Sequence, residues 1–305
     1  MTTQALPALL RNVGDTALWS AAYRAHESAE TSPLFVDPFA CALAGEQGQR
    51  LVDLVAGMNP YSWIVPVRTY LLDNFIARAA NAGIGRILNL AAGLDTRPYR
   101  MSLPRALEWI EVDSAEVFAY KQSVLGAAEP VCSLRQVVLD LADTQARDGL
   151  LDEVTRDDAP VLVISEGLLI YLKEEAVASL AETLSSRAAI RYWLIDLQSR
   201  TLQLALQRGL SVLMGEAGSW LSFAPRNGAE FFRPFGWQPL RSLSTTRAAH
   251  SAKRLPQTWS VNDSAETSAA SLRRMDTFVH VLGNVRAQNV DSSIFSPATI
   301  DPTLP

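Results

Sequence analysis

The chain has 305 residues, of which 48% are hydrophobic and 19% are charged, so it is a globular protein able to bury a substantial core. A net charge of −5 provides no basic surface, and we expect neither nucleic acid nor an anionic membrane as a partner. The two cysteines are isolated and the three histidines are scattered, which leaves no metal-ligand spacing. The N-terminus lacks a signal-peptide pattern and no apolar run is long enough to span a bilayer, so we expect a cytoplasmic protein.

The first 85 residues are predicted to form a helical cap (1–85) ahead of the first strand. A helical spacing of apolar residues over 16–24 predicts an N-terminal helix that is capped near Asp15. The other helices expected in this part are 39–44, 51–56 and a longer amphipathic one over 61–82.

After this cap, short apolar runs alternate with helical stretches, which is typical of parallel strands covered by helices on both faces. The expected strands are 86–92, 108–113, 134–139, 160–165, 190–197, 237–245 and 277–285. The expected helices between the first five strands are 95–101, 114–126, 144–154 and 173–187. The pattern predicts an α/β fold with a seven-stranded, doubly wound, mostly parallel sheet of the Rossmann-like kind.

The stretch 198–236 interrupts the alternation with helical patterns over 199–214 and 226–235, and we interpret it as a helical lid inserted over one end of the sheet. Its aromatic residues either pack onto the sheet or line an apolar acceptor pocket. They are Trp220, Phe223, Phe231, Phe232 and Phe235. The polar segment 246–270 is predicted to be a mobile loop and 290–305 an irregular tail. No linker divides the chain, so we expect residues 1–305 to form a single domain.

The first strand runs into a glycine turn, at a place where open α/β sheets bind ligands. A dinucleotide fingerprint would have another glycine three residues after Gly93, but that residue is Thr96. Asp95 stands where a helix N-terminus would otherwise attract a phosphate, and its charge favours a cation instead. S-adenosylmethionine has an ammonium, a sulfonium, a ribose and no phosphate, and it fits this turn. The alternative for Asp95 is that it only caps the following helix.

The second, third and fourth strands each end in an acid, namely Asp113, Asp140 and Glu166. Asp113 follows Gly93 by the separation at which an acid commonly accepts hydrogen bonds from both ribose hydroxyls. Because parallel strands end at the same edge of a sheet, the three carboxylates predict a negative crevice for a ligand with a diol and an ammonium. Structural alternatives stay open: Asp113 or Asp140 as a helix or turn cap, and Glu166 as a paired buried acid.

The chain resembles the leucine carboxyl methyltransferase family over roughly residues 12–240, through short motifs that occur in the same order. The motifs are Asp15–Ala17, Tyr23–Ser28, Asp37–Ala40, Val67–Thr69 with Asp73, Leu90–Arg97, Glu111–Asp113 with Lys121, Asp140–Leu141, Glu166–Leu172 and Gly236–Trp237. Each motif alone is weak, whereas their order is specific. The resemblance implies a class I methyltransferase fold with S-adenosyl-L-methionine as cofactor. It points to the bacterial small-molecule branch, which includes polyketide tailoring enzymes.

The resemblance also implies which residues contact the cofactor. Arg68 would bind the methionine carboxylate and Glu166 the amino group, while the turn from Ala91 to Gly93 would pass close to that moiety. Asp113 would bind the ribose, and Asp140 with Leu141 the adenine. Ala91 departs from the family pattern, in which many members have glycine, and its methyl group narrows the approach of backbone to ligand. The alternative for Arg68 is a solvated charge on an amphipathic helix.

The catalytic residues are not identified by any pattern, and the candidates at the acceptor site are Arg24, His26 and Tyr171. Tyr171 either faces the acceptor or packs under the lid. A carboxylate acceptor is ionised at pH 7 and needs no general base, whereas a hydroxyl acceptor would need one from His26, His250 or Glu27. We therefore predict an S-adenosylmethionine-dependent O-methyltransferase acting on a carboxylate or hydroxyl of a small secondary metabolite.

Other functions stay open at this point. One is a protein C-terminus as methyl acceptor, and another is a catalytically idle relative that binds the nucleoside and serves as a partner protein. A third is a nicotinamide-dependent oxidoreductase, against which Asp95 and Thr96 argue. The sequence does not name the acceptor, and it leaves open whether the protein forms a homodimer.

Overall fold

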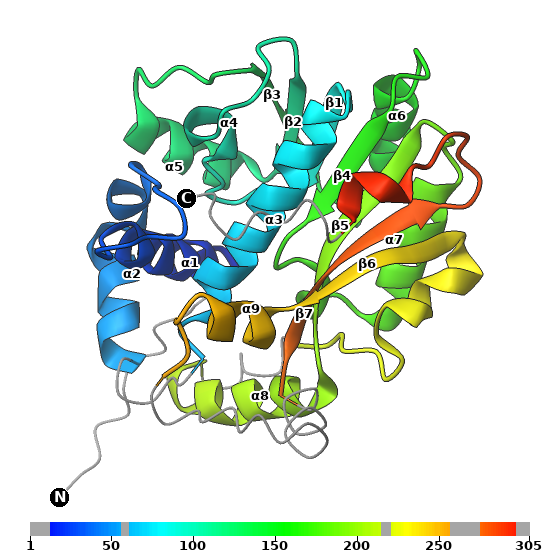
Figure 1. Ribbon diagram of the computed structural model, residues 1–305. Helices are drawn as coiled ribbons and strands as arrows, with labels where there is room; N and C mark the ends of the chain where they lie inside the picture. Colours follow the sequence, from blue (N-terminus) through cyan, green and yellow to red (C-terminus); the bar gives the residue numbers. More distant parts are fainter. Residues whose placement is uncertain (1–12, 56–60, 215–220, 257–274, 297–305) are drawn as a thin grey trace, which may run out of the picture.

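The computed structural model describes residues 13–55, 61–214, 221–256 and 275–296, and in them a sheet lies between two layers of helices (Figure 1). Trp220 and residues 257–270 of the expected loop lie outside the described residues. Within the described ranges, no helix combines the length and the apolar character that crossing a bilayer requires.

Three helices precede the first strand. They are α1 (Val13–Ser28), α2 (Ala40–Val55) and α3 (Ile64–Asn81). Asp15 lies within α1, which is described from Val13 onward, so Asp15 is not its cap and the predicted cap is wrong. α2 replaces the two short helices that were expected, and it bends at Gly45, where a φ of 55° and a ψ of −169° interrupt the helical backbone.

Seven strands form one sheet in the order β3-β2-β1-β4-β5-β7-β6. They are β1 (Arg86–Leu90), β2 (Glu108–Asp113), β3 (Ser133–Val138), β4 (Val161–Ser165), β5 (Ile190–Gln198), β6 (Trp237–Ser244) and β7 (Thr277–Asn284). The first five strands are parallel, and β7 runs antiparallel between β5 and β6. The predicted seven-stranded, mostly parallel sheet is confirmed. Its strand order reverses between β1 and β4, which is where such folds bind ligands.

Four helices connect the parallel strands. They are α4 (Arg97–Arg100), α5 (Ala115–Leu125), α6 (Thr144–Val154) and α7 (Glu174–Ser185). Side-chain oxygens fix where α5 and α6 begin, because Ser114 accepts a hydrogen bond from the Val117 amide and Asp143 accepts one from the Ala146 amide. α4 is a single turn, shorter than the predicted 95–101.

Each face of the sheet is covered by its own apolar core, because strands buried on both sides place successive side chains in opposite layers. On one face, Leu72 and Phe75 of α3 share a core with Trp109 and Leu162 of the sheet. Figure 1 shows α3, in cyan, crossing in front of the strands. On the other face, α6 and α7 cover the sheet with residues such as Leu180.

The insertion contains α8 (Arg200–Met214) and the 3₁₀ helix η3 (Gly228–Phe235). Its four described aromatic residues, Phe223, Phe231, Phe232 and Phe235, contact one another ring to ring. The Phe232 ring also meets the ring of Trp193 of β5 edge to face, with 5.3 Å between centroids. For these four residues, packing onto the sheet is therefore the correct alternative. That the insertion acts as a lid stays a prediction.

One part of the expected mobile loop is a helix, α9 (Thr245–Ser251). Ser244 caps it by accepting a hydrogen bond from the Arg247 amide at 3.0 Å. The buried carboxylate of Asp276 also accepts from the amide and the hydroxyl of Thr246, at 3.1 and 2.7 Å. The prediction of a loop is therefore wrong for these residues, because contacts with residues distant in the sequence hold this polar segment in a helix.

One part of the expected tail is also regular. Residues Ser292–Phe295 form the 3₁₀ helix η4. The Phe295 ring is 1% exposed and packs edge to face on Phe75 and Tyr192. The prediction of an irregular tail over 290–305 is therefore wrong for Ser292–Phe295.

Candidate active site

A cavity of about 950 Å³ lies where the strand order reverses, at the carboxyl ends of β1, β2, β4 and β5. Residues of α1, α3 and the insertion complete its lining. The predicted site residues that line it are Arg24, Arg68, Ala91, Gly93, Asp113, Glu166 and Tyr171. Residues far apart in the sequence therefore meet at one site.

The turn after β1 is tied to the end of β2. Ala91 and Gly93 have positive φ values of 53° and 52°, which turn the chain sharply. The Gly93 amide donates a hydrogen bond to Asp113 Oδ2 at 2.7 Å, and the Ser114 amide donates to Oδ1, also at 2.7 Å. Because the hydroxyl of Ser114 caps α5, the cap alternative for Asp113 is wrong. Its carboxylate instead fixes the turn and faces the cavity.

Glu166 follows β4 and forms two ion pairs. Its Oε1 accepts a hydrogen bond from Arg68 Nε at 3.0 Å, and its Oε2 lies 2.7 Å from Arg97 Nη1. Burial acts to raise the pKa of Glu166, but Arg97 and then Arg68 bring it below its usual range, so the carboxylate is ionised at neutral pH. Arg68 is enclosed with its side chain 14% exposed, so its alternative as a solvated charge is wrong.

Asp95 closes the turn that leads into α4 and forms an ion pair. Its Oδ1 accepts a hydrogen bond from the Arg97 amide at 2.8 Å, and its Oδ2 accepts from Arg97 Nη1 at 2.8 Å and from Asn89 Nδ2 at 2.9 Å. Burial acts to raise the pKa of Asp95, but Arg97 and Lys121 lower it to about 2. The alternative that Asp95 only caps the helix is wrong, because Thr96 is the N-cap residue of α4 and the Asp95 carboxylate lines the cavity as an anion.

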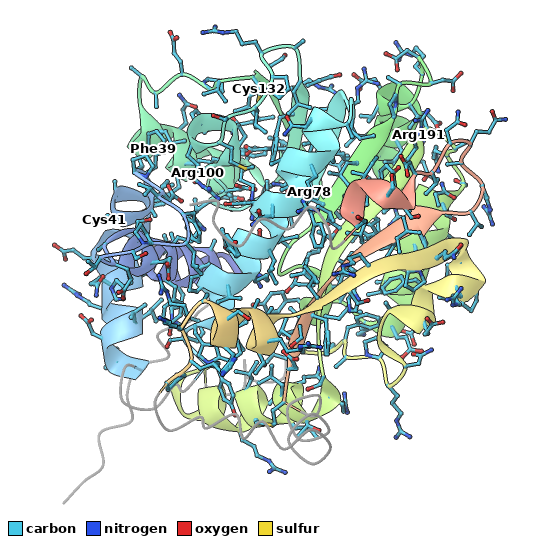
Figure 2. All side chains as sticks on the ribbon, in the orientation of Figure 1. Phe39, Cys41, Arg78, Arg100, Cys132 and Arg191 are labelled. Carbon is cyan, nitrogen blue, oxygen red and sulfur yellow. The ribbon has the colours of Figure 1, made fainter. Side chains whose placement is uncertain are left out.

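The cavity is negative in net charge, but arginines lie among its acids. Its lining contains four arginines, Arg24, Arg68, Arg97 and Arg100. In the view of Figure 2, Arg100 lies between Cys41 of α2 and Arg78 of α3. The acids that pair with these arginines are Asp37, Asp73, Asp95, Glu166 and Asp196. Asp113 and Glu116 line the cavity as well, so acids outnumber arginines and the predicted negative crevice is correct in net charge. The prediction did not include the guanidinium groups that α1, α3 and α4 bring. A site in which acids and arginines lie side by side suits a zwitterion.

Asp140 and Leu141 do not line the cavity. β3 ends at Val138, two residues before Asp140. The exposed Asp140 carboxylate accepts a hydrogen bond from the Ala142 amide at 2.9 Å, as a turn cap does. Contact of Asp140 and Leu141 with an adenine stays a prediction.

Two of the three acceptor-site candidates line the cavity. Tyr171 belongs to the 3₁₀ helix η1 (Leu169–Tyr171), and burial raises the pKa of its phenol, so the hydroxyl stays protonated. Arg24 donates hydrogen bonds to Asp37 Oδ2 at 2.9 Å and to the Leu94 carbonyl at 2.7 Å, which hold its guanidinium in place.

The candidate general bases lie elsewhere. His26 is exposed, with Nε2 at 3.0 Å from Gln49 Oε1, and His250 is exposed on α9. Glu27 is buried and pairs with Arg254 at 2.8 Å. None of the three lines the cavity, so the structure gives none of them a place as general base. In the described part of the chain, no group of three or more His, Cys, Asp or Glu side chains is arranged to hold a metal ion.

Sequence analysis missed Asp196, the acid of β5 that lines the cavity. It follows Leu194 and Ile195, the same signal of an acid after an apolar run that marked Glu166. The signal was hidden because the predicted strand continues to residue 197, which puts this acid inside it. Sequence analysis also missed Arg97, which follows the glycine turn and forms ion pairs with Asp73, Asp95 and Glu166.

The leucine carboxyl methyltransferase family model matches residues 17–185, which is more than half of the chain. The chain belongs to this family. A relative from Frankia alni that bears the name of an S-adenosyl-L-methionine-dependent methyltransferase is 31% identical over 245 residues, covering 77% of this chain and 85% of the relative. One of the same description from Parafrankia sp. is 33% identical over 260 residues, covering 80% and 83%. Among solved structures, a Thermobifida fusca protein described as a methyltransferase has a TM-score of 0.56 at 15% identity, covers 93% of this chain and 99% of its own, and shows the fold alone.

The predicted enzyme class and cofactor are thereby confirmed: the protein is a methyltransferase that depends on S-adenosyl-L-methionine. The nicotinamide-dependent oxidoreductase is excluded. The cavity fits this cofactor on its own geometry, since it offers a carboxylate at the end of β2 and an arginine beside a carboxylate at the end of β4. In the described residues, Arg68 hydrogen-bonds through Nε and Nη1, which leaves Nη2 for a ligand.

Proposed function

We propose that this methyltransferase transfers a methyl group to an oxygen atom of a small molecule, and that the acceptor is an ionised carboxylate of a secondary metabolite. The observation that carries the proposal is the protonation state of the cavity groups. The pKa of Asp95 is about 2 and that of Glu166 is lowered, so both are weak bases. A hydroxyl acceptor must lose a proton, which such groups take up poorly near pH 7, whereas a carboxylate is already ionised. Tyr171 stays protonated and is able to donate a hydrogen bond to it.

S-adenosylmethionine supplies a methyl carbon on a positively charged sulfur, and charge is neutralised as the methyl group passes to an anion. The chain's own contribution is to hold and orient. We infer that Asp113 accepts hydrogen bonds from the ribose hydroxyls, that Arg68 binds the methionine carboxylate through Nη2, and that Glu166 accepts from the ammonium. Since donor and acceptor must be in line, fixing the donor at three points contributes much of the rate enhancement.

The acceptor side of the proposal rests on an apolar part of the lining, formed by Trp19, Ile64, Val65, Ile170, Leu206 and Leu221. Leu221 is firmly held, because its carbonyl accepts hydrogen bonds from Gln203 Nε2 at 2.8 Å and from Gln207 Nε2 at 2.7 Å. The Ser222 amide in turn donates to the Ile170 carbonyl at 2.7 Å, which joins the insertion to η1. An apolar wall excludes water, which favours a reaction that neutralises charge, and it suits a small apolar acid.

The cofactor site is tested by calorimetry with S-adenosylhomocysteine. We expect micromolar binding to the native protein and loss of binding in Asp113→Ala and in Glu166→Gln. Asp157→Ala is the matched control, because this acid pairs with Arg86 on the surface, with its side chain 58% exposed, and should bind as the native protein does. Native affinity in both cavity variants would contradict the assignment of the site.

The acceptor chemistry is tested with methyl-labelled cofactor and a panel of small apolar carboxylic acids, each paired with the alcohol of the same carbon skeleton. We expect label in the acids as a methyl ester, which releases methanol on alkaline treatment. We also expect a rate that stays flat from pH 6 to pH 9, because the acceptor is ionised throughout. Transfer only to alcohols, with an alkali-stable product and a rate that rises with pH, would replace the carboxylate with a hydroxyl acceptor.

A further inference from the structure

Asp196 lines the cavity but has no role in the cofactor contacts proposed above. Ser165 pairs with Ile195 in the register of β4 and β5, so the residues that follow them, Glu166 and Asp196, lie side by side at the carboxyl edge of the sheet. Both line the cavity, and the Asp196 side chain is only 8% exposed. An acid buried to this extent is unfavourable unless its oxygens are paired.

Each oxygen of Asp196 has one partner. Oδ1 accepts a hydrogen bond from the Gly167 amide at 2.6 Å, and Oδ2 accepts from Arg68 Nη1 at 3.1 Å. Gly167 has a φ of 63°, and a Cβ atom built there would lie 3.4 Å from Arg68 Nη1. The turn after β4 thus leaves just enough room for the guanidinium, and Asp196 anchors both the turn and the arginine.

Arg68 therefore has two carboxylate partners that differ in what else they can do. Glu166 has further donors near it, since Arg97 Nη1 lies 2.7 Å from its Oε2, so it stays compensated if it leaves Arg68. Asp196 forms no ion pair with any described residue other than Arg68. Asp196 therefore needs Arg68 to stay beside it, because without Arg68 its buried charge would lose its cationic partner.

We propose that Asp196 is a positioning residue, which keeps the Arg68 guanidinium in the cavity when a ligand ammonium takes over Glu166, so that Arg68 presents Nη2 to the carboxylate of the same ligand. The ligand-free site is then an internal ion pair of Arg68 and Glu166 into which an α-amino-acid zwitterion inserts. A ligand that has the carboxylate but lacks the ammonium leaves Arg68 paired with Glu166, so it gains little from Asp196. The inference rests on the proposed role of Arg68.

The test compares binding of S-adenosylhomocysteine with binding of its deaminated analogue, which keeps the carboxylate, by calorimetry on the full chain. In Asp196→Asn we expect affinity for S-adenosylhomocysteine to fall roughly 10- to 100-fold, the effect of displacing one charge-assisted contact. Affinity for the deaminated analogue should change by less than about threefold, because Arg68 keeps Glu166 as a partner. Asp157→Asn is the matched control and should leave both affinities unchanged, because this acid lies on the surface.

A merely structural role for Asp196 would weaken both ligands alike, and that result, or unchanged binding of both, would overturn the inference. If Asp196→Asn fails to fold, the double variant Arg68→Gln/Asp196→Asn removes both charges together and should bind S-adenosylhomocysteine no more weakly than Arg68→Gln alone. A further loss in the double variant would also overturn it. Arg68→Gln separates the two levels: if it leaves the affinity for both ligands unchanged, the proposed role of Arg68 itself fails.

Discussion

The buried ion pair between Glu111 of β2 and Lys121 of α5 allows a quantitative prediction about stability. Both side chains are 0% exposed, and Lys121 Nζ lies 2.7 Å from Glu111 Oε1. The other carboxylate oxygen accepts a hydrogen bond from Gln136 Nε2 at 3.0 Å. Burial raises the pKa of Glu111, although Lys121 and the hydrogen bonds oppose the rise. Removing Lys121 therefore leaves a buried carboxylate with one neutral partner.

We expect Lys121→Met to lower the free energy of unfolding by about 3 kcal/mol at pH 7. This is the free energy needed to protonate a carboxyl whose ordinary pKa is 4.5, the route by which the buried group escapes its charge, and it agrees with the ~3–5 kcal/mol typical of broken buried pairs. The double variant Glu111→Gln/Lys121→Met leaves no buried charge and should recover all but about 1 kcal/mol of the loss. Urea unfolding followed by circular dichroism measures both.

The pH dependence gives a second check on the same variant. The folded-state pKa of Glu111 in Lys121→Met lies above its unfolded value, so the penalty is absent below the unfolded pKa and grows as the pH rises through the window up to the folded pKa. The loss should therefore be smaller at pH 5 than at pH 7. The reasoning is refuted if the double variant is as unstable as the single one, or if the loss does not depend on pH.

Four further predictions concern single groups. Ala91→Gly should stabilise the fold by about 0.5–1 kcal/mol in thermal unfolding, because relief of a left-handed alanine (φ 53°) outweighs the entropy of glycine, and a lower melting temperature would contradict this. Asp95→Asn should lower the free energy of unfolding by about 2 kcal/mol at pH 7. This difference from the native protein should vanish as the pH falls from about 4 to 2, because the native carboxylate with its lowered pKa of about 2 then becomes protonated, and urea unfolding at several pH values measures it. Burial lowers the pKa of His280 from 6.5 to about 4, so the free energy of unfolding of the native protein should fall by up to about 3 kcal/mol as the pH is lowered from 6.5 to 4. The same urea series should show no such fall in His280→Gln. Cys41 is exposed and Cys132 is buried with a pKa raised to about 11, so a thiol reagent should modify one cysteine in the native protein and two in denaturant, and two native modifications would contradict the burial (Figure 2).

The strands could be predicted from sequence because a parallel strand buried on both faces is a continuous apolar run, as in Val161–Ser165. α9 could not, since its residues are polar and its order depends on Asp276, which is distant along the chain. The same holds for η4, where Phe295 reaches its partners Phe75 and Tyr192 only in the folded protein. Local pattern therefore predicts the sheet but not the segments that long-range contacts order.

In the active site, Asp113 and Glu166 were predictable because Asp113 ends β2 and Glu166 follows β4, at the shared edge of the sheet. Asp140 follows the same rule in sequence, yet its strand ends two residues earlier and its side chain turns to the backbone. The pairing of acids with arginines was not predictable, because Arg68 meets Glu166 and Asp196 only after α3 has packed across the sheet.

The place of β7 has a consequence for how the protein is made. Among the described strands β7 comes last in sequence, yet it lies between β5 and β6 and is hydrogen-bonded to both. While the polypeptide emerges from the ribosome, β6 has no neighbour to join and the outer edge of β5 stays open until Thr277–Asn284 has left the exit tunnel. The nascent enzyme thus exposes an unpaired β6 and an open edge of β5 until β7 has been made, and during this stage a chaperone would protect it most.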